Sequence, residues 1–125
     1  MTDRIYQDIF DKLLDYLPDE WQKVIYVAWY TNGSYCMKYY SKTDNNKYVD
    51  CFNMPGISKS AITNLFMDLH RLIAENREEL DKNKLWTVFT MQVDSNGYMK
   101  AFFEYEDHSQ DLLNYEREWE KKYLV

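Results

Sequence analysis

The 125-residue sequence contains few of the residues from which common catalytic and cofactor sites are built. Its three glycines, Gly33, Gly56 and Gly97, all fall at predicted turns, so no glycine-rich loop is present to bind phosphate or a dinucleotide. The two cysteines and two histidines show neither a Cys-x-x-Cys nor a His-Glu-x-x-His spacing. We therefore expect no catalytic residue, no cofactor and no metal ligand.

Long apolar runs are also missing. No run approaches the roughly 18 residues that a membrane helix needs. The first residues, 1–5, begin an amphipathic helix and do not resemble a signal peptide. Acidic residues outnumber basic ones, 21 to 15, and the pI of about 4.9 argues against the basic surface that phosphate binding requires. We therefore expect a cytoplasmic protein with no membrane contact and no direct nucleic-acid ligand.

What the chain does have is apolar and aromatic residues. It is 46% hydrophobic, 18% aromatic and 29% charged, which is typical of a globular protein. At this length, a single domain over residues 1–125 can bury a sizeable core.

Hydrophobic periodicity predicts an α+β fold: an antiparallel sheet of about five strands with helices packed on it, in the order α-β-β-β-α-β-β-α. A helix is expected over 3–17, because Pro18 would stop it, and a long helix should begin after Ser58 or Ser60. The late part of that long helix, 75–84, is almost wholly charged and should protrude or fray. Strands are expected over 24–30, 34–43 and 48–53, then in a second hairpin, and a last helix from about Asp111 carries its apolar stripe inward.

The second hairpin permits a test of its register. A two-residue turn at Asn96-Gly97 would mix polar and apolar residues on both faces. A three-residue loop, 95–97 with Gly97 left-handed, pairs Phe89 with Phe103 and gives one uniformly apolar face. The three-residue loop is the prediction. It places Glu104 and Glu106 on the opposite face, together with Trp86.

The two cysteines should be unpaired. A turn centred on Asn45-Asn46 sets Cys51 opposite Tyr40, with Cys36 on the same face four residues along the strand. That separation is roughly 13 Å, whereas a disulfide needs Cα atoms within about 7 Å. The prediction is two reduced, buried thiols.

Net charge is concentrated in the last quarter of the chain. Between Glu104 and Glu120 there are seven acids and one base, Arg117, so this segment alone carries the −6 of the whole chain. Aromatic rings, among them Tyr105 and Trp119, alternate with the acids. Acids and rings gathered in this way indicate a surface that meets a basic partner.

Other interpretations of individual residues remain open. Glu104 and Glu106 alternate along a strand about 7 Å apart, and could act as an acid–base pair or bind a divalent ion, or could simply face solvent or a partner. The tyrosines at positions 35, 39 and 40 could line a ligand groove or fill the core. His70 is expected at the edge of the core, and His108 is expected to be exposed.

Several short motifs together resemble the YezG-like immunity proteins of Gram-positive bacteria. The amino-terminal ones are the segment 2–7, Leu17-Pro18 with Trp21, Met54-Pro55 and the segment 85–90. The carboxyl-terminal ones are Gly97, the segment 103–107, the segment 115–117, Trp119 and the segment 122–124. The resemblance spans essentially the full chain and implies a cytoplasmic antitoxin that binds the nuclease domain of a secreted toxin of the type exported by type VII machinery.

A nuclease site must hold phosphates and is therefore basic, so an acidic surface with aromatic residues could occupy or flank it. The alternative is an acidic interaction or regulatory module with a non-nuclease partner, and a homodimer is also possible. The residues expected to contact the partner are Trp86, Tyr98, Glu104, Glu106, Asp107, Asp111, Glu116 and Glu120.

Overall fold

The computed structural model describes residues 3–31, 34–43, 47–54, 56–81 and 85–124. These residues form three α-helices, one short 3-10 helix and a five-stranded sheet. In chain order the elements are α1 (Asp3–Leu14), β1 (Trp21–Thr31), β2 (Ser34–Thr43), β3 (Val49–Asp50), η1 (Cys51–Asn53), α2 (Lys59–Glu78), β4 (Val88–Asp94), β5 (Met99–Glu104) and α3 (Leu112–Tyr123). The predicted α+β class and element order are confirmed.

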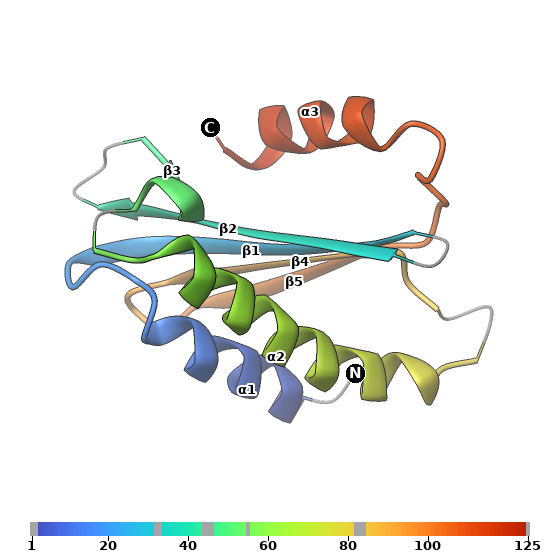
Figure 1. Cartoon of the computed structure of the whole chain (residues 1–125), viewed down its shortest axis with the longest axis horizontal. Helices are drawn as coiled ribbons and strands as arrows, with labels where there is room; N and C mark the ends of the chain where they lie inside the picture. The colour runs from blue at the N-terminus through green and yellow to red at the C-terminus, as the bar shows by residue number, and fades with distance from the viewer. Residues whose placement is uncertain (1–2, 32–33, 44–46, 55, 82–84, 125) are drawn as a thin grey trace.

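The sheet is antiparallel, with strand order β3-β2-β1-β4-β5. Helices α1 and α2 cover one face and α3 covers the other (Figure 1). The central strand β1 is therefore covered on both sides, and every residue from Val24 to Tyr30 is buried. Burial on both faces explains why this segment is continuously apolar and does not alternate with polar residues.

Two hydrophobic clusters lie on the two faces of the sheet. Alternate residues of β1 point to opposite sides, so Tyr26 joins the cluster under α1 and α2, whereas Trp29 joins the cluster under α3. The ring of Trp29 meets that of Trp119 edge to face, with 5.8 Å between centroids. As predicted, the apolar stripe of the last helix points inward.

The β4–β5 hairpin has the predicted three-residue loop. Phe89 pairs with Phe103, the N–H of Asp94 donates to the carbonyl of Tyr98 at 3.0 Å, and the N–H of Gly97 donates to the carbonyl of Asp94 at 3.0 Å. Gly97 has φ +93°, in the left-handed region that glycine adopts without a Cβ clash. The register argument is confirmed.

The predicted third strand over 48–53 is too long. Only Val49 and Asp50 pair with β2, because the Asp50 side chain accepts a 2.9 Å hydrogen bond from the N–H of Phe52 and starts a 3-10 turn. Tyr40 faces Asp50, so the expected pairing of Tyr40 with Cys51 is wrong by one residue. The turns predicted at 32–33 and 45–46 lie outside the described residues.

Both cysteines are free, as predicted, although the geometry used to predict this was wrong. Cys51 is buried in the cluster under α1 and α2, whereas Cys36 is partly buried against the cluster under α3. The two thiols therefore lie on opposite faces of the sheet, and the sheet itself separates them.

The ends of the first two helices refine two predictions. Helix α1 ends at Leu14 and not at residue 17, and the following turns include a bond from the N–H of Leu17 to the carbonyl of Leu14. Ser58 caps α2 by accepting from the N–H of Ala61 at 3.1 Å.

Among the described residues, no helix combines the length and apolarity needed to cross a membrane.

Arg77 anchors the charged end of α2 to the rest of the protein. The guanidinium of Arg77 lies 4.3 Å from the ring centroid of Tyr30, and its Nη2 donates to the carbonyl of Trp86 at 2.6 Å. This contact holds the last turn of α2 against the sheet, so the prediction of a protruding or frayed segment is wrong for Arg77. Residues 82–84 of that segment lie outside the described chain.

Candidate protein-interaction surface

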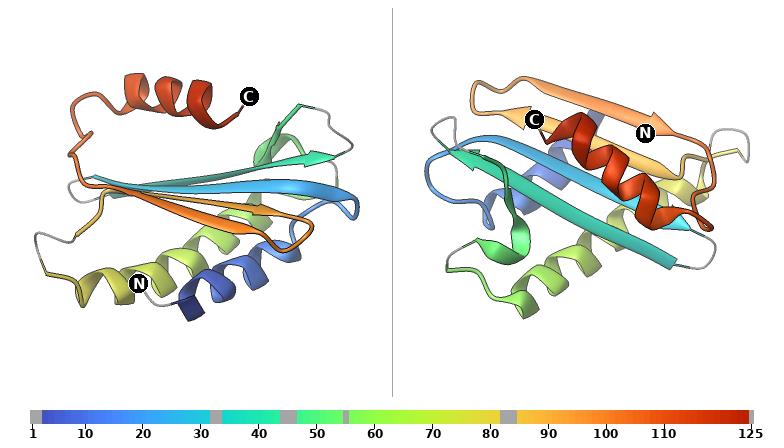
Figure 2. Two further views of the ribbon diagram at one scale, coloured as in Figure 1. Left: turned by 180° about the vertical axis from the view of Figure 1, so that it is seen from behind. Right: turned by 90° about the horizontal axis from the view of Figure 1, so that it is seen from above.

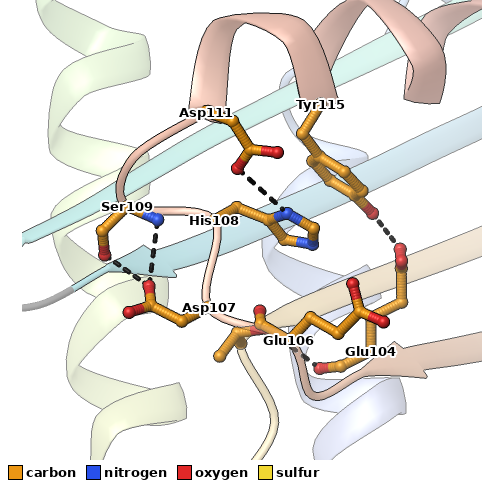
Figure 3. A network of polar contacts seen from close by, with 8 residues as sticks. Glu104, Glu106, Asp107, His108, Ser109, Asp111 and Tyr115 are labelled. Atoms are coloured by element: carbon orange, nitrogen blue, oxygen red, sulfur yellow. Dashed lines mark hydrogen bonds and ion pairs between the residues drawn. The ribbon is translucent and has the colours of Figure 1, made fainter.

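The acidic segment folds into a corner between the sheet and α3, here called the acidic corner and defined as residues 104–115 (Figure 3). It starts at the last residue of β5, turns over residues 105–111 and enters α3. Four of the predicted contact residues, Glu104, Glu106, Asp107 and Asp111, are brought together here. The local folding of this corner decides which of their carboxylates face solvent.

Glu104 binds the corner to the rest of the protein. Its side chain is half-buried, and the hydroxyl of Tyr115 on α3 donates a hydrogen bond to its Oε2. Burial raises the pKa of the Glu104 carboxyl, and the nearby His108 and Lys122 oppose this rise only in part. Glu104 therefore helps to hold α3 on the sheet and presents only part of its charge to solvent.

His108 is buried, so its predicted exposure is wrong. It is 9% exposed, and its ring stacks on Tyr115 with 3.8 Å between centroids. Its Nδ1 lies 3.5 Å from Oδ1 of Asp111, and its buried Nε2 makes no hydrogen bond to a described residue. Proximity to a turn predicted exposure, but the first turn of α3 covers the ring.

The other acids of the corner are exposed. Oδ1 of Asp107 accepts from the N–H of Ser109 at 2.9 Å, and the hydrogen bonds from Ser109 lower the pKa of the Asp107 carboxyl. The backbone carbonyl of Glu106 accepts from Oγ1 of Thr87 at 2.5 Å, which fixes the chain and leaves the Glu106 side chain in solvent. Glu106, Asp107 and Asp111 thus form a solvent-facing acidic set at one end of β5.

The acids of α3 lie apart from that set, near cations of the same chain. Oε1 of Glu116 is 2.7 Å from Nζ of Lys38 on β2, and both side chains are mostly buried. Burial lowers the pKa of Lys38, but the hydrogen bond and charge of Glu116 outweigh it and raise the pKa overall. Glu120 is exposed beside a hollow of about 800 Å³ that Lys42 and Lys47 also line. The predicted acidic surface is therefore split between the acidic corner and α3, and the charge of Glu116 is neutralised by Lys38.

The two aromatic residues predicted to contact the partner differ in their exposure to solvent. Tyr98 is 75% exposed at the start of β5, whereas Trp86 is 2% exposed in the cluster under α1 and α2. Trp86 precedes β4, so the strand alternation used to place it with Glu104 does not extend to it. Its predicted face is wrong, and its side chain is not available to a partner in this fold.

Sequence reasoning did not select the other exposed apolar residues of this region. Phe102 is 39% exposed, Tyr105 57% and Leu113 65%. The predicted register already set Phe102 apart from the apolar face, and Leu113 lies off the inward stripe of α3, so both positions could have been found from the sequence. Tyr105 and Leu113 belong to the acidic corner itself, whereas Tyr98 lies at the opposite, loop end of β5.

Two alternative sites lose support. Glu106 lies beyond the end of β5, so strand spacing does not place it beside Glu104. Within the described part of the chain, no three His, Cys, Asp or Glu side chains are grouped as a metal site requires. Tyr39 and Tyr40 are buried in different clusters. Tyr35 borders a hollow of about 500 Å³, whereas Tyr40 borders the separate hollow of about 800 Å³ beside Glu120. The three tyrosines do not line a common groove.

Comparison with known proteins gives consistent results over nearly the whole chain. The sequence model of a family described as "Immunity protein YezG-like" matches residues 2–125. "Immunity protein YezG" of Bacillus subtilis strain 168 is 31% identical, over 96% of this chain and 85% of that protein. A protein of the same name from Bacillus spizizenii is 28% identical over 88% of this chain and 72% of its own length. "Type VII secretion system protein EsaG" of Staphylococcus aureus is 29% identical over 83% and 68%.

Proposed function

Because this chain belongs to the YezG-like family of immunity proteins, we propose that it is a cytoplasmic antitoxin that binds the nuclease domain of a secreted toxin and neutralises it by stoichiometric association. The family match over residues 2–125 carries this proposal. The name of the Staphylococcus aureus relative supports a toxin that leaves the cell through type VII secretion. The chain acts as a binding protein and performs no catalysis.

The surface suggests how the association would work. A nuclease binds phosphates through a basic surface, and the exposed carboxylates of Glu106, Asp107 and Asp111 have the opposite sign. Such charges mainly accelerate the encounter between partners. The exposed rings of Tyr98 and Tyr105 supply the desolvated area that carries most affinity in protein interfaces.

Charge-neutralising variants test the acidic mechanism. In Glu106→Gln/Asp107→Asn/Asp111→Asn, the three solvent-facing acids of the corner become amides, which keep an acceptor oxygen for Ser109 and His108, while Glu104 and Glu116, which contact α3 and β2, are kept. The matched control, Asp15→Asn/Asp19→Asn/Glu75→Gln, removes three exposed acids from the α1–α2 side and changes the net charge equally. The measurement is the association rate with the nuclease domain of the cognate toxin, at low and high salt, together with survival of cells that produce both proteins.

We expect the first variant to associate at least about tenfold more slowly than the control at low salt, with the difference shrinking as salt screens the charges. Equal rates for the two variants would refute the acidic mechanism. Failure of the unaltered chain to bind the nuclease domain or to protect cells would refute the antitoxin proposal itself. Binding to a partner without nuclease activity would favour the regulatory-module alternative.

A further inference from the structure

The two edges of the sheet differ in a way that bears on how a partner would bind. One edge is β3, which pairs through only two residues, and short edge strands are one way in which proteins avoid unwanted pairing. The other edge is β5, which pairs with β4 in continuous register from Met99 to Glu104 and lies at the outer side of the sheet (Figure 2). Among the described residues, no strand pairs with its outer side.

The hairpin hydrogen bonds show which backbone groups of β5 point outward. The carbonyl of Tyr98 accepts from Asp94, so the even-numbered residues of β5 direct their backbone groups toward β4. Because alternate residues of an antiparallel strand face opposite sides, the N–H and C=O groups of Met99, Ala101 and Phe103 point away from the sheet. These groups form a ready template for another extended segment.

The side chains along this edge do little to block such pairing. β5 contains no proline, and Lys100 is its only cation, although charges and prolines commonly protect exposed edges. Met99 is 41% and Phe102 39% exposed, one on each face of the edge, and Tyr98 is exposed at its start. An added strand would therefore gain main-chain hydrogen bonds as well as apolar contact on both faces.

Charge around the edge selects the kind of partner. At the loop end of the hairpin, Lys23 and Lys100 offset Asp94. At the other end, Glu104, Glu106 and Asp107 outnumber the nearby Lys122, so the excess of negative charge lies where β5 meets the acidic corner. A second copy of this chain would bring the same acids and a further net charge of −6. A segment with cationic side chains would instead place them beside these carboxylates.

We propose that an extended, basic segment of the toxin adds to the free edge of β5 as a sixth strand, hydrogen-bonded to Met99, Ala101 and Phe103. This inference rests on the proposed antitoxin function and names the surface that performs it. It assigns the main-chain contacts to the β5 edge and the charge contacts to the acidic corner at its end.

Amide hydrogen exchange measured residue by residue tests the pairing. In the free protein, the amides of Met99, Ala101 and Phe103 should exchange faster, relative to unstructured peptide, than those of Lys100, Phe102 and Glu104, which face β4. Adding the catalytically inactivated nuclease domain of the cognate toxin should slow the three outward amides by about tenfold or more, and the inward ones far less.

A pair of variants checks the same point by affinity. Ala101→Pro removes an N–H that β4 does not use, and proline is tolerated at such edge positions. Ala101→Ser keeps the N–H and serves as the control. We expect the proline variant to bind the toxin domain at least about tenfold more weakly and the serine variant to bind within about twofold of the unaltered chain.

The outcomes separate the two proposals. Tight toxin binding without protection of the outward amides would overturn the edge-pairing inference and leave the antitoxin function standing. Absence of toxin binding would overturn both. Protection that appears without toxin, and grows with protein concentration together with a doubled mass, would overturn the toxin as occupant and assign the edge to a second copy.

Discussion

Thr90→Val should weaken the attachment of α3, which carries part of the acidic corner, to the sheet. Nε1 of Trp119 on α3 donates to Oγ1 of Thr90 on β4 at 3.0 Å. Thr90 is 1% exposed and Trp119 2%, so water does not reach either atom in the folded protein. Valine keeps the size and β-branching of threonine, so the substitution mainly removes the acceptor and leaves a buried N–H without a partner.

The expected cost follows from that burial. Leaving a buried donor unpaired costs about 1–3 kcal/mol of the free energy of unfolding. This is a substantial part of the roughly 5–15 kcal/mol that stabilises a domain of this kind. Urea denaturation followed by circular dichroism should show a lower midpoint with an unchanged slope.

A double-mutant cycle isolates the hydrogen bond. Trp119→Phe removes the donor, and once it is gone Thr90→Val should cost much less, so the two changes should be coupled by roughly 0.5–3 kcal/mol. Trp86→Phe is the matched control: it alters a buried tryptophan on the other face of the sheet whose Nε1 makes no hydrogen bond to a described residue. Its effect should add to that of Thr90→Val. Additivity of the Trp119 pair within about 0.3 kcal/mol would refute the reasoning.

Two further predictions concern Glu104 and the cysteines. The pKa of Glu104 is raised in the folded protein, so ionisation of this carboxyl opposes folding, and stability is lost as the pH rises from below its ordinary pKa through the raised one. Glu104→Gln should therefore be more stable relative to the unaltered chain at about pH 7 than at about pH 3 in denaturation curves, and the opposite trend would contradict this explanation. Burial raises the pKa of the Cys51 thiol to about 12 and leaves it inaccessible, while Cys36 is only partly buried. Mass spectrometry after brief thiol alkylation should find Cys36 modified first and Cys51 modified only on unfolding, and equal rates would contradict the burial of Cys51.

Features with local causes could be predicted from the sequence. The β4–β5 register followed from requiring one apolar face, and Gly97 was the residue suited to the left-handed position of the loop. Ser58 was one of two candidate caps for α2 because a serine side chain can accept from a backbone N–H two or three residues ahead. The inward stripe of α3 followed from helical spacing. Each of these depends on residues close together in the chain.

Features that depend on distant segments could not be predicted in the same way. Trp86 was placed on the wrong face because strand alternation stops where β4 begins, and Arg77 covers the ring from α2. His108 was expected in solvent because nothing nearby in sequence shows that Tyr115 stacks on it. The third strand was predicted too long because the Asp50 side chain captures a backbone N–H that a strand would have used.

The sequence by itself determined the element order, the family and the concentration of acid in the last quarter of the chain, because these depend on periodicity, motif spacing and composition. Only the tertiary structure decided which of those acids face a partner. Glu116 is neutralised by Lys38 and Glu104 is held by Tyr115, whereas Glu106, Asp107 and Asp111 remain in solvent at the end of a free strand edge. The exposure of a side chain depends on what folds over it, and here those covering residues come from β2 and α3.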